Sequence, residues 1–220
     1  MSINIAIDGP AGAGKSSIAK AASAKLGYIY VDTGALYRSI ALYAMNKNLD
    51  NENLIGKLTD IELKLEFIEG SQHVILCGED VSEKIRTPEV SMEASRISAI
   101  PEVRSFLLDL QKKIARENNI IMDGRDIGTV ILPNADLKIF LTASPEERAQ
   151  RRYKELKQAG NDTVTYEGIL EDIKQRDYND MHRETAPLKK ADDAVILDTT
   201  GMTVEESVNS LLDMVKNLGE

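Results

Sequence analysis

A glycine-rich stretch near the start of the chain has the residue types that bind phosphate. Residues 9 to 16 read Gly-Pro-Ala-Gly-Ala-Gly-Lys-Ser and fit the pattern G-x-x-x-x-G-K-[ST]. Glycines let the backbone curl with its N–H groups pointing inward. Lys15 supplies charge for the β and γ phosphates, and the Ser16 hydroxyl suits Mg²⁺, which prefers oxygen ligands. The pattern predicts a nucleotide-binding loop made of Gly9, Pro10, Ala11, Gly12, Ala13, Gly14, Lys15, Ser16 and Ser17.

Two further segments place arginine and aspartate just after predicted strands. Residues 32–38 read Asp-Thr-Gly-Ala-Leu-Tyr-Arg, and residues 123–126 read Asp-Gly-Arg-Asp. Arg38 and Arg125 both occur in loop-like settings. Because ligands bind at the carboxyl ends of strands in open α/β sheets, we expect both arginines to lie at the same edge of the sheet as the glycine-rich loop. Asp123 follows an apolar strand and is predicted to orient Mg²⁺ or its waters. The alternatives are surface ion pairs for the arginines and a turn-forming role for Asp123.

A third cluster has helical spacing. Arg176, Asp180 and Arg183 lie four and three residues apart, so they share one helical face. That face can be a self-satisfied surface network, or it can present Asp180 to a sugar hydroxyl and the arginines to phosphates. His182 falls off the face and His73 lies beside a predicted turn, so neither receives a catalytic role. Convergent arginines favour a small-molecule kinase, which must hold two polyanions together.

Short apolar runs alternate with helical patterns, which predicts an α/β fold with a three-layer parallel sheet. Ser144 and Thr203 have the sequence signature of helix N-caps. The predicted strands are 3–7, 28–31, 119–122, 137–141 and 194–197, and the predicted helices are 14–26, 36–45, one from Ser144 and one from Thr203.

Two segments depart from this alternation. Residues 63–68 and 74–76 flank Glu-Gly-Ser-Gln, which predicts a small antiparallel hairpin insert over roughly 58–86. Residues 148–165 are polar and rich in arginine, which predicts a mobile helical lid. The alternative for this segment is an ordinary solvated helix end.

Composition excludes several classes of protein. The 220 residues carry a net charge of −9 and a pI near 4.9, which argues against a non-specific nucleic-acid or membrane binder. The single cysteine, Cys77, allows no intrachain disulfide, and its apolar surroundings predict a buried side chain. The start of the chain does not resemble a signal peptide, and no apolar run is long enough to span a bilayer. We expect a cytoplasmic protein and, because no coiled-coil seam is visible, a monomer.

At this point the motifs are recognisable: the sequence resembles the bacterial cytidylate kinases, of the nucleoside-monophosphate kinase group. The resemblance covers essentially the full length. It is carried by residues 8–16, 32–38, 78–82 with 85–87, and the more specific D-G-R-D-x-G-T of residues 123–129. The resemblance implies a P-loop core (1–35, 97–147 and 166–220), an acceptor-binding part with the hairpin insert (36–96) and a lid (148–165). It also implies ATP with Mg²⁺ as donor, and CMP with dCMP as acceptor.

The resemblance further implies a role for each matching residue. The acceptor phosphate would be bound by Thr33 (often Ser in the group), Arg38, Arg125 and Arg183. The sugar would be held by Arg176 and Asp180. The base would be read by Ser95, Arg104 and Asp126. The phosphoryl group in transit would be stabilised by Lys15, Arg125, Arg183 and the lid candidates Arg148 and Arg152, while Mg²⁺ would be bound near Ser16 and Asp123.

The base-reading set makes chemical sense. Cytosine offers an N4 amino donor and two ring acceptors, so a carboxylate can accept from N4 while Arg104 and Ser95 donate. Uracil has an oxygen at position 4, which would face the Asp126 carboxylate, and a buried mismatch of this kind costs about 1–3 kcal/mol.

Two rival functions remain from the sequence alone. One is a kinase for another acceptor, such as UMP. The other is a nucleotide-dependent switch that hydrolyses ATP slowly. A GTPase is disfavoured, because the nearest string to its N-K-x-D motif is Asn-Lys-Asn-Leu at 46–49.

Overall fold

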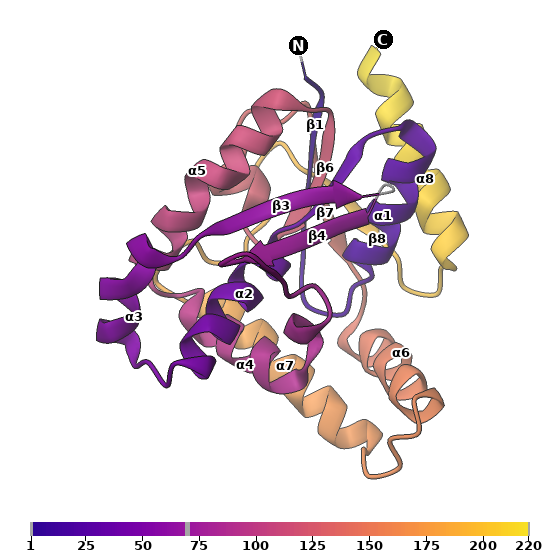
Figure 1. Ribbon diagram of the computed structural model, residues 1–220. Helices are drawn as coiled ribbons and strands as arrows, with labels where there is room; N and C mark the ends of the chain where they lie inside the picture. Colours follow the sequence, from indigo (N-terminus) through magenta and orange to yellow (C-terminus); the bar gives the residue numbers. More distant parts are fainter. Residues whose placement is uncertain (1, 69–70, 220) are drawn as a thin grey trace.

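A five-stranded sheet is the central element of the computed structural model, which describes residues 2–68 and 71–219 (Figure 1). The strand order is β2-β6-β1-β7-β8, and each neighbouring pair runs parallel. Parallel neighbours need crossover connections over the faces of the sheet. The strands are β1 (Asn4–Asp8), β2 (Ile29–Asp32), β6 (Ile120–Gly124), β7 (Leu137–Thr142) and β8 (Val195–Asp198).

Helices lie in these crossovers, and the last helix follows the final strand. They are α1 (Lys15–Leu26), α2 (Thr33–Asn46), α3 (Asn51–Lys57), α4 (Pro88–Ile97), α5 (Pro101–Glu117), α6 (Pro145–Gln158), α7 (Tyr166–His182) and α8 (Val204–Lys216). Short helical turns are η1 (Leu58–Asp60), η2 (Lys84–Arg86), the π-helical η3 (Ile127–Ile131) and η4 (Asn217–Gly219).

The sheet is buried on both faces. In β1, Ile5 and Ile7 pack with α1 and α8, whereas Ala6 packs with α5 and η3 on the opposite face. Successive side chains of a strand point to opposite faces, so a strand buried on both sides is apolar throughout. The predicted three-layer parallel α/β fold is therefore confirmed.

The predicted strands and helices are present, mostly with boundaries shifted by one or two residues. The larger difference is at α2, which begins at Thr33 rather than at Leu36. The Asp32 carboxylate accepts the Ala35 N–H at 3.0 Å and so caps the helix one turn earlier than apolar periodicity indicates. Arg38 lies within this helix, as the predicted range 36–45 already implied, and not in a loop.

The hairpin insert is confirmed and gains a third strand. The small antiparallel sheet consists of β3 (Leu63–Ile68), β4 (Ser71–Leu76) and β5 (Glu79–Asp80). Part of its predicted turn, Glu69 and Gly70, lies outside the described residues. Gln72 accepts the Asp32 N–H at 2.9 Å and donates to the Asp32 carbonyl at 3.3 Å. The insert thereby contacts the end of β2, an edge strand of the main sheet.

Cys77 differs from its predicted burial, because its side chain is exposed. Leu76 pairs with Glu79, so only Cys77 and Gly78 connect β4 to β5. Both have positive φ, 49° and 85°, as a tight two-residue hairpin turn requires. The apolar run ends at Leu76, and Cys77 belongs to the turn.

The helices α6 and α7 form a hairpin that extends away from the sheet (Figure 1). Ala149, Ile169 and Ile173 form its own small core. Ser144 caps α6 by accepting the Glu147 N–H at 3.1 Å, as its sequence signature predicts. Among the helices of the described residues, none has both the length and the apolar character that crossing a bilayer requires.

We predict that Gly9→Ala is strongly destabilising. A Cβ at Gly9 would lie 1.9 Å from the Leu141 carbonyl oxygen, a backbone atom that cannot move aside without distorting β7. The loss in free energy of unfolding, measured with urea, should be about 3 kcal/mol or more. Gly27→Ala is the matched control: φ is 70° there, but nothing lies within 4 Å, so only the backbone penalty of about 1–2 kcal/mol applies. Equal losses in the two variants would contradict this account.

Candidate active site

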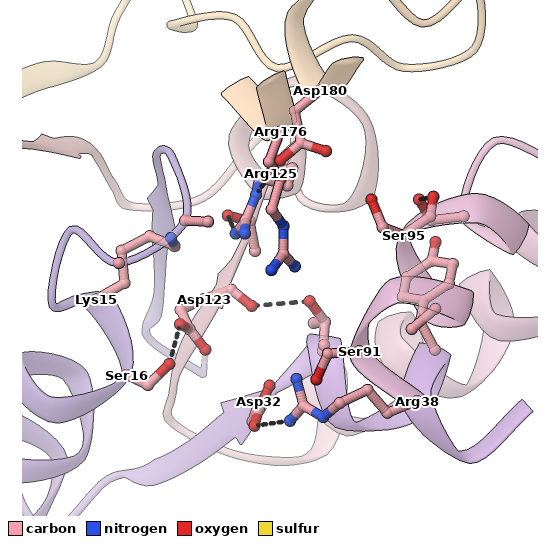
Figure 2. A pocket seen from close by; sticks show the side chains of 18 of the residues that line it. Lys15, Ser16, Asp32, Arg38, Ser91, Ser95, Asp123, Arg125, Arg176 and Asp180 are labelled. Atoms are coloured by element: carbon pink, nitrogen blue, oxygen red, sulfur yellow. Dashed lines mark hydrogen bonds and ion pairs between the residues drawn. The ribbon is translucent and has the colours of Figure 1, made fainter. Parts of the chain in front are cut away.

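A cleft of about 350 Å³ opens at the carboxyl ends of β1, β2 and β6. Figure 2 shows Lys15 and Ser16 on one wall, Ser91 and Ser95 opposite, and Arg125 and Arg176 between them. The sequence-predicted residues that line it are Ala11, Gly12, Gly14, Lys15, Ser16, Ser17, Thr33, Arg38, Ser95, Arg104, Asp123, Arg125, Asp126, Arg176, Asp180 and Arg183. Those that do not line it are Gly9, Pro10, Ala13, Arg148 and Arg152.

The glycine-rich loop leads directly into α1. Gly12 and Gly14 have φ of 73° and 90°, a left-handed conformation that glycine adopts without penalty. Gly14 is the N-cap and no side chain caps the helix, so N–H groups of the first turn are left without a side-chain acceptor there. Lys15 is buried, and its Nζ donates to the Pro10 carbonyl at 2.8 Å. Burial, and then the nearby Arg125 charge, lower the pKa of Lys15.

Asp123 lies beside this loop at the end of β6. Its carboxylate accepts from Ser16 Oγ at 2.9 Å and from the Tyr30 hydroxyl at 3.0 Å. Burial, and then the charge of Asp32, raise the pKa of Asp123. Within the described residues no group of three or more acidic, histidine or cysteine side chains gathers as a metal cage. A hydroxyl and one carboxylate, both hard oxygen donors, fit Mg²⁺ that takes its other ligands from phosphate and water.

Arginine side chains converge from α2, α7 and the loop after β6. Arg38 pairs with Asp32 at 2.8 Å, and the Arg125 Nε donates to Asp180 at 2.8 Å. Within the described part of the chain, three buried guanidinium nitrogens have no hydrogen-bond partner: Arg38 Nε, Arg176 Nε and Arg183 Nη2.

These nitrogens indicate what the cleft binds. A buried N–H without a partner costs free energy, and the cost is larger for a charged group. Burial, and then the neighbouring Arg125, lower the pKa of Arg176. The arrangement therefore suits an anion that accepts several N–H bonds, such as a phosphate.

A second cluster of charged side chains lines the same cleft. Asp126 forms an ion pair with Arg104, and its other oxygen is 3.6 Å from Arg183 Nη2. Arg104 also donates to the Ser98 carbonyl at 3.1 Å. Burial raises the pKa of Asp126, while Arg104 and then Arg183 oppose that shift.

The sequence analysis missed several residues that line this cleft: Asp32, Tyr37, Ser91, Ser98 and Glu155. The Tyr37 ring lies 5.8 Å from the Arg104 guanidinium carbon, and burial raises the pKa of Tyr37 to about 12. Ser91, Ser95 and Ser98 are spaced four and three apart, a helical-face pattern that was available in the sequence. Tyr37 lies in the motif of residues 32–38, but no role was assigned to it from the sequence.

The structure differs from the expectation for Arg148. This side chain is buried, donates to the carbonyls of Ala143 and Ala11 at 2.9 Å each, and pairs with Asp177. It joins the base of the helical hairpin to the glycine-rich loop and is not part of a solvent-facing flap. Arg152 is half exposed and contacts Glu155, which itself lines the cleft, at 3.3 Å.

A phosphate-binding loop at the end of a central parallel strand, opposite converging arginines, defines a P-loop nucleotide-binding protein. The particular family follows from relatives of known name. Residues 5–217 match the family model described as cytidylate kinase. The cytidylate kinase of Caldicellulosiruptor saccharolyticus is 53% identical over 215 residues, which cover 96% of this chain and 95% of that protein. That of Clostridium tetani is 47% identical and covers 99% of this chain and 95% of that protein. This chain therefore belongs to the cytidylate kinase family, as its motifs predicted.

A comparison of folds adds a more distant likeness. An uncharacterised protein from Eubacterium ventriosum matches with a TM-score of 0.56 at 12% identity, covering 99% of both chains. At this identity the likeness concerns the fold alone.

We predict that Lys15→Met stabilises the ligand-free protein at neutral pH. The unfolded chain keeps the Lys15 proton up to its ordinary pKa of 10.5, whereas in the folded chain burial lowers this pKa to about 7. Between these values the unfolded state binds more protons, so the contribution of Lys15 to stability rises with pH. At pH 7 the variant should unfold about 2–4 °C above wild type, and the gap should shrink by pH 9.

The control is Lys20→Met, an exposed lysine on the same helix. Its unfolding temperature should follow that of wild type at both pH values. A Lys15→Met gap that is absent at pH 7, or that widens at pH 9, would show that the buried ammonium does not destabilise the empty site.

Proposed function

We propose that this protein transfers the γ-phosphoryl group of ATP to CMP, and to dCMP, giving CDP or dCDP and ADP. The observation that supports this most directly is that the arginines with unpartnered guanidinium nitrogens line the same cleft as the phosphate-binding loop. One cleft therefore offers two places for phosphate. Membership of the cytidylate kinase family favours CMP over UMP as the acceptor.

On the donor side, residues 9–17 surround the ATP phosphates, with Lys15 and the first N–H groups of α1 binding their oxygens. Ser16 and Asp123 would hold Mg²⁺, which neutralises phosphate charge when bound. The hydrogen bond between these two side chains supports this assignment, because it keeps both oxygens at one point beside the loop.

On the acceptor side, Thr33, Arg38, Arg125 and Arg183 bind the 5′-phosphate, and Arg176 and Asp180 bind the sugar. The Thr33 hydroxyl donates to the Asp123 carbonyl at 2.8 Å. This contact supports a position for Thr33 between the acceptor and the donor side.

Asp126, Arg104 and Ser95 read the cytosine. Asp126 accepts from the N4 amino group, while Arg104 and Ser95 donate to ring acceptors. The ion pair between Asp126 and Arg104 supports this role, because it holds the carboxylate and the guanidinium side by side in the cleft.

The reaction needs no protein base, because the acceptor phosphate is already anionic at neutral pH. An acceptor phosphate oxygen attacks the γ-phosphorus in line. The bond between the γ-phosphorus and the oxygen that bridges the β and γ phosphates breaks, and ADP leaves. Lys15, Arg125 and Arg183 stabilise the charge of the group in transit. The helical hairpin that contains residues 148–165 closes over the site and excludes water, and Arg152 reaches the phosphates. Arg148 stays at the base of the hairpin and holds the Ala11 carbonyl of the loop.

The setting is proposed as cytoplasmic pyrimidine nucleotide metabolism, with the protein acting as a monomer on free nucleotides. The net charge of −9 disfavours nucleic-acid and membrane partners.

An acceptor panel tests this function. Purified protein with ATP and Mg²⁺ should release ADP rapidly with CMP and dCMP, slowly with UMP and AMP, and hardly at all without an acceptor. Lys15→Ala should reduce CMP phosphorylation by about 10³-fold, because it removes a charge that stabilises the transferring group. Its circular dichroism should match wild type. ADP release that is independent of any acceptor would instead support a hydrolytic switch.

Specificity is tested by Asp126→Ala. The CMP/UMP ratio of kcat/KM should fall at least about tenfold, because the variant loses the acceptor for N4 and the group that opposes uracil O4. Ser98→Ala, which removes a cleft hydroxyl not assigned to the base, is the matched control and should keep the ratio. An unchanged ratio in Asp126→Ala would remove this residue from base recognition.

A further inference from the structure

The last residue of β1, Asp8, has a buried carboxylate to which no role has been assigned. It is 4% exposed, and it immediately precedes the phosphate-binding loop. Its Oδ1 accepts the Ile127 N–H and its Oδ2 accepts the Gly128 N–H, each at 2.7 Å. One side chain of the donor-side strand thus binds two consecutive backbone amides of the loop that carries the acceptor-side residues.

Those two amides open the π-helical turn η3. The first N–H groups of a helical turn have no partner within it and need an outside acceptor. Asp126 occupies the N-cap position, but its side chain makes no capping bond because it faces Arg104. The capping function therefore falls to Asp8, 119 residues before Ile127.

We propose that Asp8 is a positioning residue for the acceptor site, and that it fixes Arg125 and Asp126 relative to the phosphate-binding loop. This rests on the proposed function. Arg125 and Asp126 directly precede the two amides that Asp8 binds. Phosphoryl transfer depends on the relative placement of the two substrates, so a tie between their binding loops controls how well they are aligned.

Other contacts keep the turn close to Asp8 and keep β1 itself in place. A Cβ at Gly128 would lie 3.1 Å from the Lys138 side chain and 3.4 Å from Asp8 Oδ2, so the turn packs closely between these two groups. Asp8 pairs in the ladder with Gly124 of β6 and with Phe140 of β7. The backbone leading into the phosphate-binding loop is thereby held independently of the carboxylate.

The chemistry requires a carboxylate. Both of its oxygens accept hydrogen bonds, whereas an amide offers one oxygen and would turn an N–H₂ group toward the second backbone N–H. Burial raises the pKa of Asp8 to about 6, against the backbone N–H bonds and the charge of Lys15, which lower it.

The test is Asp8→Asn, a change of nearly equal volume. We expect the KM for CMP to rise about tenfold, as the loss of a charged hydrogen bond implies, while the KM for ATP changes less than twofold. Asp198→Asn is the control: Asp198 ends β8 and accepts from the backbone of Thr200, away from the acceptor loop. Both KM values should stay within twofold of wild type in that variant.

Equal rises in the two KM values, or no rise in either, would overturn the proposal. If wild type itself failed to phosphorylate CMP, the proposed function would fail instead, which separates the two.

Hydrogen exchange on wild type gives a second readout in case Asp8→Asn does not fold. The Ile127 and Gly128 amides should exchange as slowly as the amides of β1, and rapid exchange would show that Asp8 does not hold them.

Discussion

The gathering of positive charge in one buried cleft is the constraint to which the rest of the structure responds. After burial, the charge of Arg125 is the next cause that lowers the pKa of both Lys15 and Arg176. Such a group of cations is tolerated in a folded chain only if carboxylates separate its members. Asp123 and Asp180 provide these carboxylates, yet guanidinium nitrogens remain unpaired. The excess of positive charge in the cleft suits a phosphate group, independently of any contact to a base or sugar.

The fold brings these charges together by aligning the ends of three neighbouring parallel strands. β1 leads into the phosphate-binding loop, β2 into Thr33 and Arg38, and β6 into Asp123 and Arg125. Each strand contributes one part of the site. The hydrogen-bonded register between the strands fixes the relative positions of their carboxyl ends. The remaining wall comes from α4 and α7, which belong to parts of the molecule with hydrophobic clusters of their own. The glycine-rich loop, Arg125 and Asp126 therefore extend from the sheet, whereas Ser95, Arg104 and Arg176 lie on helices packed around it.

The sequence made the strand-end residues predictable, because their positions follow from short-range patterns. A strand, a glycine-rich loop and a helix occur in order around Lys15, and an apolar strand directly precedes Asp123. Features that depend on tertiary packing were not predictable in this way. Arg148 looked like a solvated lid residue until the structure placed Asp177 and a loop carbonyl around its guanidinium. The exposure of Cys77 followed from the start of a third strand too short to have a sequence pattern.

The same distinction explains why the sequence indicated no role for Asp8, although Asp8 is part of the motif of residues 8–16. Its partners are backbone amides, which any sequence supplies, and they lie more than a hundred residues away. The geometry nevertheless follows from the chemistry of the site. Because Asp126 is committed to Arg104, it cannot cap the turn that follows it, and a buried turn without a cap would be unstable. A neighbouring strand end must then supply the acceptor, and β1 is the neighbour that also leads into the phosphate-binding loop. The residue that satisfies the turn is thus placed where it also ties the two substrate-binding loops together.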